Sequence, residues 1–204
     1  GGNLNVIDPT DGSIINTLDL GIGYPDGITK YADYLVITDL TNSEFVLLDS
    51  QTFEVISIIP TPVSGSNYSG GIEWDGSYFW HNDSRSGEGG SDNVTVKMTS
   101  NFDVLEEFCI TDQIPGSDYL GDLTWDGEYL WLSENELDYI HRVNPEDFSV
   151  DRTIAWMENY PNGIAFDGQY LWVGDNGSDM IYQLDIGYGG GSDVAGCTDP
   201  SACN

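Results

Sequence analysis

The chain has very little positive charge. Its 204 residues include 5 lysines and arginines against 35 aspartates and glutamates, which gives a formal net charge of −30 at pH 7. Proteins neutralise phosphate groups with clustered Lys and Arg, so this composition excludes nucleic acids and anionic membrane surfaces as partners. Self-repulsion of this size predicts compensation by salt or bound cations, both of which a saline, calcium-containing exterior would supply.

Apolar runs, helical periodicity and enzyme motifs are also scarce. No apolar run approaches the roughly 20 residues that a membrane span needs, so we expect no membrane insertion. No stretch has the i, i+3, i+4, i+7 spacing of an amphipathic helix. The sequence has no G-x-S-x-G elbow, phosphate-binding loop or H-E-x-x-H motif, and its only histidines are His81 and His141. Both are expected to be structural, although a Ser-His-Asp triad using either one stays open.

A segment that begins with tyrosine and ends 15 residues later with a carboxylate occurs four times without a gap. Successive tyrosines lie 44, 51 and 41 residues apart. A period in the forties with strand-type composition is typical of the blades of a β-propeller. The four copies run from Tyr24 to Asp39, Tyr68 to Asp83, Tyr119 to Glu134 and Tyr160 to Asp175.

Each copy is expected to form a β-hairpin with an A strand and a B strand. In the last copy, Asp167-Gly168 separates a run around Ile164 from the aromatic run 170–173. Asp-Gly tolerates the positive φ of tight hairpin turns. Residues 31–33 of the first copy lack Asp-Gly, which predicts a looser turn there.

Two more strands, C and D, follow each of the first three hairpins, and this predicts an all-β propeller of four-stranded antiparallel blades over residues 1–186. The sequence before the first copy is typical of strands C and D, whereas the last copy ends after strand C. An N-terminal D strand could therefore close a four-bladed ring by strand swapping. Five C strands are one too many for that ring, so a larger or incomplete ring, or a surplus strand that pairs elsewhere, stays open.

Residues before strand A and after strand B lie at the same end of a hairpin, so each tyrosine is expected beside its own acid on one face of the propeller. In one interpretation the acids accept backbone hydrogen bonds in turns and the tyrosines pack against neighbouring blades. In the other, the acids are metal ligands for Ca²⁺ and the tyrosines form a ligand face for sugars or amines. Further acids on this face are Asp26, Asp122, Glu136, Asp138 and Asp179.

The second copy is followed by an extended B–C loop, residues 82–93, which is rich in glycine and serine. It breaks the symmetry of the proposed face. We interpret it either as a loop that contacts a ligand or as a surface excursion.

From residue 187 the chain becomes a Gly-rich linker followed by a short tail. Cys197 and Cys203 could form a disulfide in an oxidising compartment, or pair with a partner beyond residue 204. The motif G-C-T-D-P-x-A-C-N at residues 196–204 resembles the start of a cysteine-containing repeat near the C-termini of large secreted proteins of marine Bacteroidetes. The resemblance implies export, by a type IX route, and a longer parent chain.

The blade motif G-I-x-[WF]-D-G-x-Y-[LF]-W resembles the repeat of secreted bacterial propellers of the YncE and NHL groups, over about residues 20 to 185. This resemblance implies the fold rather than the function, because propellers serve in binding, scaffolding and catalysis.

Three functional hypotheses follow. The first is a secreted or cell-surface module for binding, adhesion or assembly, without catalysis, stabilised by calcium. Its partners would be other domains of the parent chain, cell-surface proteins, glycans or a second copy. The second is a secreted propeller enzyme, such as a lyase or cyclotransferase, that acts from the Tyr/acid face. The third is a structural subunit that associates with itself through the surplus N-terminal strand.

Overall fold

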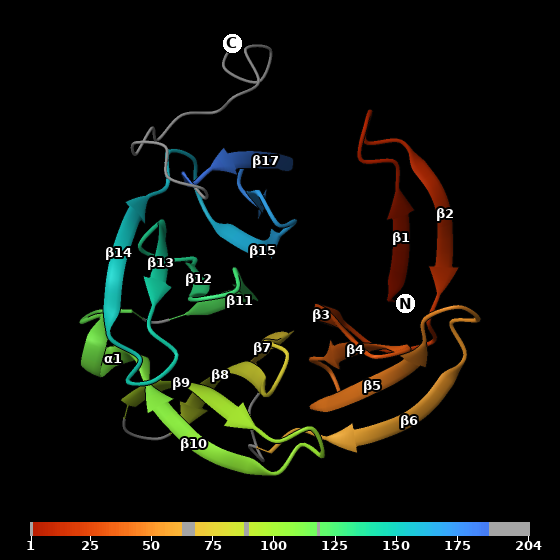
Figure 1. Cartoon of the computed structure of the whole chain (residues 1–204), viewed down its shortest axis with the longest axis horizontal. Helices are drawn as coiled ribbons and strands as arrows, with labels where there is room; N and C mark the ends of the chain where they lie inside the picture. Colours follow the sequence, from red (N-terminus) through yellow and green to blue (C-terminus); the bar gives the residue numbers. More distant parts are fainter. Residues whose placement is uncertain (1, 63–67, 88–89, 118, 188–204) are drawn as a thin grey trace.

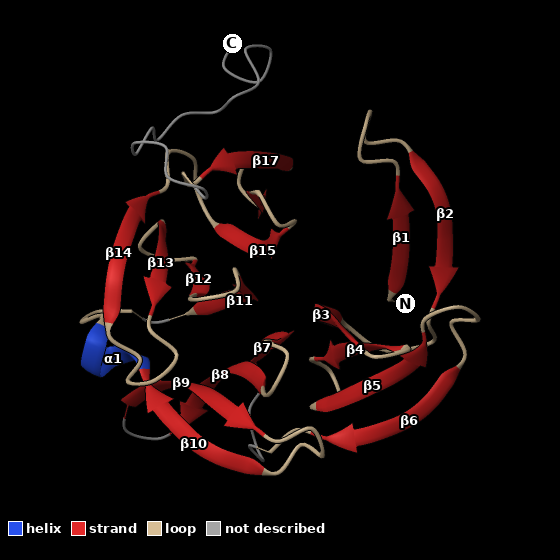
Figure 2. Ribbon diagram, viewed as in Figure 1, coloured by secondary structure: helices blue, strands red, loops and turns tan. Residues whose placement is uncertain are grey.

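The protein is an all-β propeller, shown here by a computed structural model that describes residues 2–62, 68–87, 90–117 and 119–187. Its antiparallel sheets stand side by side around a common centre (Figures 1 and 2). Within the described ranges one short helix, α1 (Ile110–Gln113), interrupts the strands. The predicted tail, including Cys197 and Cys203, lies outside the described residues from 188 onward.

Three blades have four strands each, in the order A, B, C, D from the centre outward. The first contains β3 (Pro25–Tyr31), β4 (Tyr34–Asp39), β5 (Glu44–Asp49) and β6 (Val55–Pro60). The second contains β7 (Tyr68–Trp74), β8 (Phe79–Gly87), β9 (Gly90–Met98) and β10 (Val104–Cys109). The third contains β11 (Leu120–Trp125), β12 (Leu130–Glu134), β13 (Tyr139–Val143) and β14 (Val150–Ala155).

The fourth blade has three strands, β15 (Pro161–Phe166), β16 (Tyr170–Asp175) and β17 (Met180–Asp185). A separate hairpin of β1 (Asn3–Ile7) and β2 (Ile14–Asp19) lies beside the first blade. The predicted four blades are present, but the expected closure by an N-terminal D strand is wrong for the part of the chain that the structure describes. There β2 pairs only with β1, and β17 only with β16, because the N-terminal strands stay paired as one hairpin.

The Gly/Ser-rich segment of the second blade continues the sheet. Pairing between β8 and β9 runs without a break from Phe79 opposite Met98 to Gly87 opposite Gly90. The expected loop is therefore mostly a long two-stranded extension, since polar residues such as serine can continue a register already set by buried neighbours.

The first hairpin turn is shorter than the others, contrary to the expectation of a looser turn. Tyr31 pairs with Tyr34, which leaves two residues in the turn, and Ala32 adopts a φ of 51°. In the second blade Trp74 pairs with Phe79, which leaves four. Without Asp-Gly, the chain takes a two-residue turn with a positive φ.

The hydrophobic core lies between successive blades. One cluster joins Phe45 of β5 to Ile72 and Phe79 of the second blade, and another joins Trp80 of β8 to the third blade. A further cluster joins Trp131 of β12 to Ile164 and its neighbours in the fourth blade. Each blade therefore depends on its neighbour to bury its hydrophobic side chains. The described part contains no helix long and apolar enough to cross a membrane.

Candidate functional site

The Tyr and acid columns meet at one end of each A–B hairpin, as predicted from their spacing. The residue after each tyrosine pairs with the acid: Pro25 with Asp39, Ser69 with Asp83, Leu120 with Glu134, and Pro161 with Asp175. The carbonyls of three tyrosines, in the first, third and fourth copies, accept a hydrogen bond from the N–H that follows the acid.

The acids hold the loops of this face. Asp39 accepts hydrogen bonds from the N–H groups of Gly23 (3.0 Å), Tyr24 (3.1 Å) and Thr41 (3.0 Å), and from the amide of Asn42 (2.8 Å). Burial acts to raise the pKa of Asp39, but these hydrogen bonds outweigh burial and the pKa is lowered.

The third and fourth blades use their acids in the same way. Glu134 accepts a hydrogen bond from Leu137 N–H at 2.5 Å. Asp175 accepts hydrogen bonds from Ser178 N–H and from the indole N–H of Trp156, both at 2.7 Å. In the first, third and fourth blades, the acid therefore accepts hydrogen bonds from turns, and in the fourth also from an indole.

The tyrosines differ in exposure. Tyr24 is 58% exposed and Tyr160 is 40% exposed, whereas Tyr119 is half-buried. The side chain of Tyr68 lies outside the described ones. Tyr160 has a φ of 73°, and Asp138 accepts a hydrogen bond from its N–H at 2.8 Å. Much of the side chain of Tyr24 and of Tyr160 is therefore exposed to solvent instead of being packed against the next blade.

The further acids do not form one group: Asp26 and Asp122 lie on innermost strands, whereas the other three lie after the B strands. Asp138 and Asp179 occupy left-handed positions in the B–C turns, with φ values of 56° and 58°, and Glu136 is exposed. Aspartate tolerates this backbone region better than most residues. Among the described residues, no group of three or more His, Cys, Asp or Glu side chains is placed to hold a metal ion. Calcium binding by the acid column stays a prediction.

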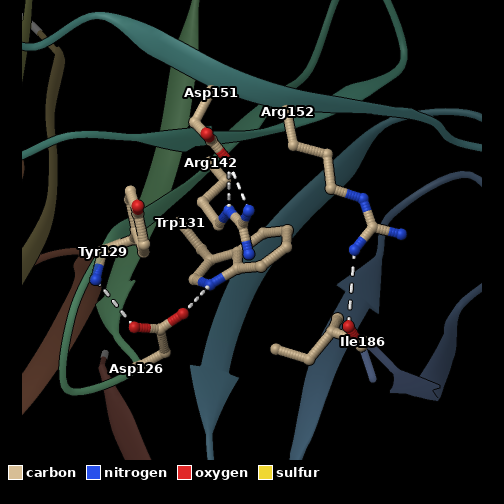
Figure 3. Close-up of polar contacts among 7 residues, drawn as sticks. All are labelled: Asp126, Tyr129, Trp131, Arg142, Asp151, Arg152 and Ile186. Carbon is tan, nitrogen blue, oxygen red and sulfur yellow. Dashed lines mark hydrogen bonds and ion pairs between the residues drawn. The ribbon is translucent and has the colours of Figure 1, made fainter. Parts of the chain in front are cut away.

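The opposite end of the hairpin in the second, third and fourth blades carries an arrangement that sequence reasoning missed. Asp126 accepts hydrogen bonds from Tyr129 N–H and from the indole N–H of Trp131, both at 2.7 Å (Figure 3). It also accepts one from Glu128 N–H. In the same way, the indole N–H groups of Trp80 and Trp172 donate hydrogen bonds to Asp75 and Asp167. A tryptophan five residues after the aspartate of every Asp-Gly turn is the signal that could have revealed it.

Two of the five cations stack on these tryptophans. Arg142 lies over the rings of Tyr129 and Trp131 and forms an ion pair with Asp151 (Figure 3). Lys97 lies over Trp80 in the same way, at 5.0 Å from the ring centroid. The scarce positive charge is therefore used to cover aromatic rings in cation–π contacts.

Polar side chains near the centre connect neighbouring blades. Thr38 donates a hydrogen bond to the carbonyl of Gly70 in the second blade at 2.9 Å, and Ser133 donates one to Asn162 of the fourth blade at 2.5 Å. Both residues directly precede the acid of their blade. The equivalent residue of the last blade is Gly174, which has no side chain to make such a bond.

Three carboxyls on the innermost strands have raised pKa values. Burial raises the pKa of Asp26 to about 6 and the pKa of Glu73 to about 7. Burial raises the pKa of Asp122 well above its usual value, and the nearby charges of Asp26 and Glu73 add to that effect. Glu73 was not identified from the sequence, because nothing in its own strand shows that neighbouring blades would enclose it.

Two of these carboxyls also bind the backbone of the next blade. Glu73 accepts a hydrogen bond from Trp125 N–H, and Asp122 accepts one from Ile164 N–H at 3.3 Å. Thr29 and Thr124, which align with Glu73 in the repeat, accept the corresponding N–H groups of Trp74 and Phe166. Glu73 therefore occupies a repeated position on the inner strand. In three blades, the side chain at this position accepts a hydrogen bond from the inner strand of the next blade.

Both histidines are enclosed, as expected for structural residues. The ring of His81 contacts the carbonyl of Gly71 through Nδ1 at 2.9 Å, and the ring of His141 contacts Thr153 through Nδ1 at 3.0 Å. Burial lowers the pKa of each to about 4, so both rings are neutral near pH 7. Within the described part of the chain, the two rings therefore bind a backbone carbonyl and a threonine hydroxyl rather than the serine and carboxylate of a triad.

The fold and this face define the class of protein as a β-propeller. No protein-family model and no curated protein sequence matches the chain. Its fold is similar to virginiamycin B lyase from Staphylococcus aureus, a catalytically inactive variant with quinupristin, at a TM-score of 0.56 and 22% identity over 86% of this chain. It is also similar to glutaminyl cyclase from Myxococcus xanthus, at a TM-score of 0.64 and 12% identity over 89% of this chain.

A third similar structure is the β-propeller domain of Cps50 (Swd1) from Myceliophteria thermophila, with a TM-score of 0.56 and 10% identity over the whole of this chain. The chain spans 56% of the lyase, 76% of the cyclase and 64% of the Cps50 domain. Similarity at these low sequence identities establishes the fold alone. Two of the three similar structures are enzymes and the third is the Cps50 domain, so the shared fold does not identify a function.

Proposed function

We propose that the protein is a non-catalytic binding, adhesion or assembly module of an exported protein, and that the Tyr/acid face makes the contacts. The observation that carries this proposal is the pairing of an exposed aromatic ring with a loop that a buried carboxylate holds in place. Tyr24 is exposed while Asp39 fixes its backbone. A ring presented on a fixed loop loses little conformational freedom when it binds.

Glycans and amine-bearing groups are the ligands that suit this face. Aromatic faces stack on sugars and attract cations, and the net charge of −30 draws cationic ligands toward the surface. Asp39, Glu134 and Asp175 accept hydrogen bonds from backbone N–H groups, which argues against their use as general acids or bases. Export to the cell surface or medium is supported by the acidity and by the cysteine motif of the tail.

The test is calorimetric titration with two probes, chitosan oligomers and their neutral N-acetylated counterparts. A double variant, Tyr24→Ala with Tyr160→Ala, is expected to weaken binding at least tenfold. Tyr78→Ala is the matched control, because Tyr78 is 38% exposed at the opposite end of its hairpin. The proposal would be contradicted if the unmodified protein, the double variant and Tyr78→Ala bound equally, or if the unmodified protein bound neither probe.

Calcium is proposed as a stabilising ion. Carboxylate oxygens are the ligands that Ca²⁺ prefers, and added positive charge would reduce the self-repulsion of the chain. The melting temperature is expected to rise when calcium replaces chelator at low salt, by more than it rises with magnesium at the same ionic strength. An identical melting temperature with calcium and with chelator would remove the ion from the proposal.

Catalysis is the second candidate, and the raised pKa values of the inner carboxyls favour it. Carboxyls that titrate near pH 6 to 7 are typical of general acids and bases. The activities of the two similar enzymes provide the assay, with quinupristin and a peptide that begins with glutamine as substrates. We expect no turnover of either; turnover that Glu73→Gln abolishes would favour the enzyme.

A further inference from the structure

The outer edge of the last blade is an incomplete sheet. In the third blade, β13 pairs with β12 on one side and with β14 on the other, whereas β17 pairs only with β16 among the described strands. Met180 and Ile181 of β17 are 52% and 59% exposed. A small cavity of about 80 Å³, lined by Ile154, Trp156 and Leu184, lies beside this strand.

The N-terminal hairpin is the complementary half of a blade. Its turn has the hydrogen bonds of a C–D turn: Gly12 N–H bonds to the Asp8 carbonyl, as Phe148 N–H bonds to the Asn144 carbonyl in the third blade. Gly12 has a φ of 73°, close to the 58° of Phe148. We therefore identify β1 and β2 as strands C and D of a blade without strands A and B.

These two incomplete sheets face each other across the gap in the ring. The two sheets lie on either side of the opening in the ring (Figure 1). A groove of about 660 Å³ between them is lined by Ile7, Asp8 and Gly12 on one side and by Trp172, Met180 and Ile181 on the other. At the equivalent place between the second and third blades, Phe148 packs against Trp80 and Phe108.

The missing strands form one continuous unit. The last blade lacks strand D and the N-terminal hairpin lacks strands A and B, and D, A, B is their order along the repeat. We propose that the gap accepts one further repeat with the strand order D–A–B, supplied by the parent polypeptide ahead of β1, which completes a ring of five blades.

A second copy of the described chain would not supply this unit. Its own D, A and B strands are paired within its sheets, and its two ends lack the same strands. A repeat that leads directly into β1 suits the gap better, because the B–C connections of the other blades are short, as between Asp175 and Met180. The unit would pair its D strand with β17 and its B strand with β1, so both open edges would be covered.

The test adds a D–A–B unit taken from the chain itself. A copy of residues 150–179, which contains β14, β15 and β16, is joined directly ahead of Asn3 of the full chain. The matched control carries Ile164→Asp and Leu171→Asp in the added copy only, because both residues are buried in the last blade. Hydrogen exchange of β1, β13 and β17, melting temperature, and molar mass by light scattering are measured for the fusion, the control and the unmodified chain.

We expect amides of β17 and β1 to exchange at least tenfold more slowly in the fusion than in the control, and the fusion to melt at least 10 °C higher as a monomer. Equal exchange in fusion and control would overturn the proposal. The proposal would also be overturned if the amides of β17 in the unmodified chain were already as protected from exchange as those of β13, or if they were protected because the chain forms dimers. If the fusion does not fold, a peptide of residues 149–156 added to the unmodified chain must slow exchange at β17, and failure to do so overturns the proposal.

Discussion

The contact between the second and third blades and the gap beside the last blade place the same turn in two different surroundings. In the third blade, Phe148 occupies the turn and is fully enclosed, stacked on Phe108 at 4.9 Å between ring centroids. In the N-terminal hairpin, Gly12 occupies it and a Cβ there would meet nothing within 4 Å. Blades of one sequence pattern are thus joined by side chains that reach across the boundary, and the boundary stays open where those side chains are missing.

The largest effect is expected at Phe148. Phe148→Ala should lower the free energy of unfolding by about 3–5 kcal/mol, since it leaves a cavity between two aromatic rings. Urea unfolding of the variant, followed by circular dichroism, measures this change. A loss below about 1 kcal/mol would mean that the boundary between these blades does not depend on the turn residue.

The aspartates of the Asp-Gly turns provide a matched pair. Asp126→Ala should cost about 2–3 kcal/mol, because Asp126 is 4% exposed and its loss leaves the indole N–H of buried Trp131 without an acceptor. Asp167→Ala should cost below about 1 kcal/mol, since water can replace the lost acceptor in the exposed turn. Equal costs in thermal and urea unfolding would contradict the distinction between enclosed and open blades.

Glu73 should make stability depend on pH. Its pKa is raised to about 7 in the folded protein, so the unfolded chain releases this proton first as the pH rises. The stability associated with its protonated form is complete below about pH 4.5 and is lost as the pH rises to about 7. The free energy of unfolding of Glu73→Gln, measured with urea, should therefore exceed that of the wild type by about 1–3 kcal/mol at pH 8. This advantage in free energy should be smaller at pH 5. An advantage that does not change with pH would show that Glu73 is not enclosed.

The smallest effect is expected at Gly12. Phenylalanine is accepted at this turn position with φ values of 59°, 64° and 58° in the three complete blades. Gly12→Phe should therefore change the free energy of unfolding by less than about 1 kcal/mol, because the new ring has nothing to pack against. A larger gain in urea unfolding would indicate that the last blade and the hairpin are close enough to share a core.

The repeat spacing predicted the sheets and the end at which each tyrosine meets its acid, because hairpin pairing follows from local pattern. It did not predict the carboxyl pKa values, since the enclosure of Glu73 and Asp122 depends on the inner strands of other blades. Nor did it predict the open ring: a strand count shows one C strand too many, but not which pairing a surplus hairpin keeps. The short first turn at Ala32 was missed because the absence of Asp-Gly was interpreted as irregularity.

The tryptophan that follows each Asp-Gly turn allows the solvent exposure of three blades to be compared by fluorescence. Trp80 and Trp131 are fully enclosed and Trp172 is half-buried, although all three donate to a carboxylate at 2.7–2.8 Å. Emission from Trp172 should therefore lie at longer wavelengths than emission from Trp80 and Trp131, and Trp172 should be the most accessible of the three to a quencher. Acrylamide is the quencher to choose, because the net charge of −30 would repel iodide and make every indole seem more protected than it is.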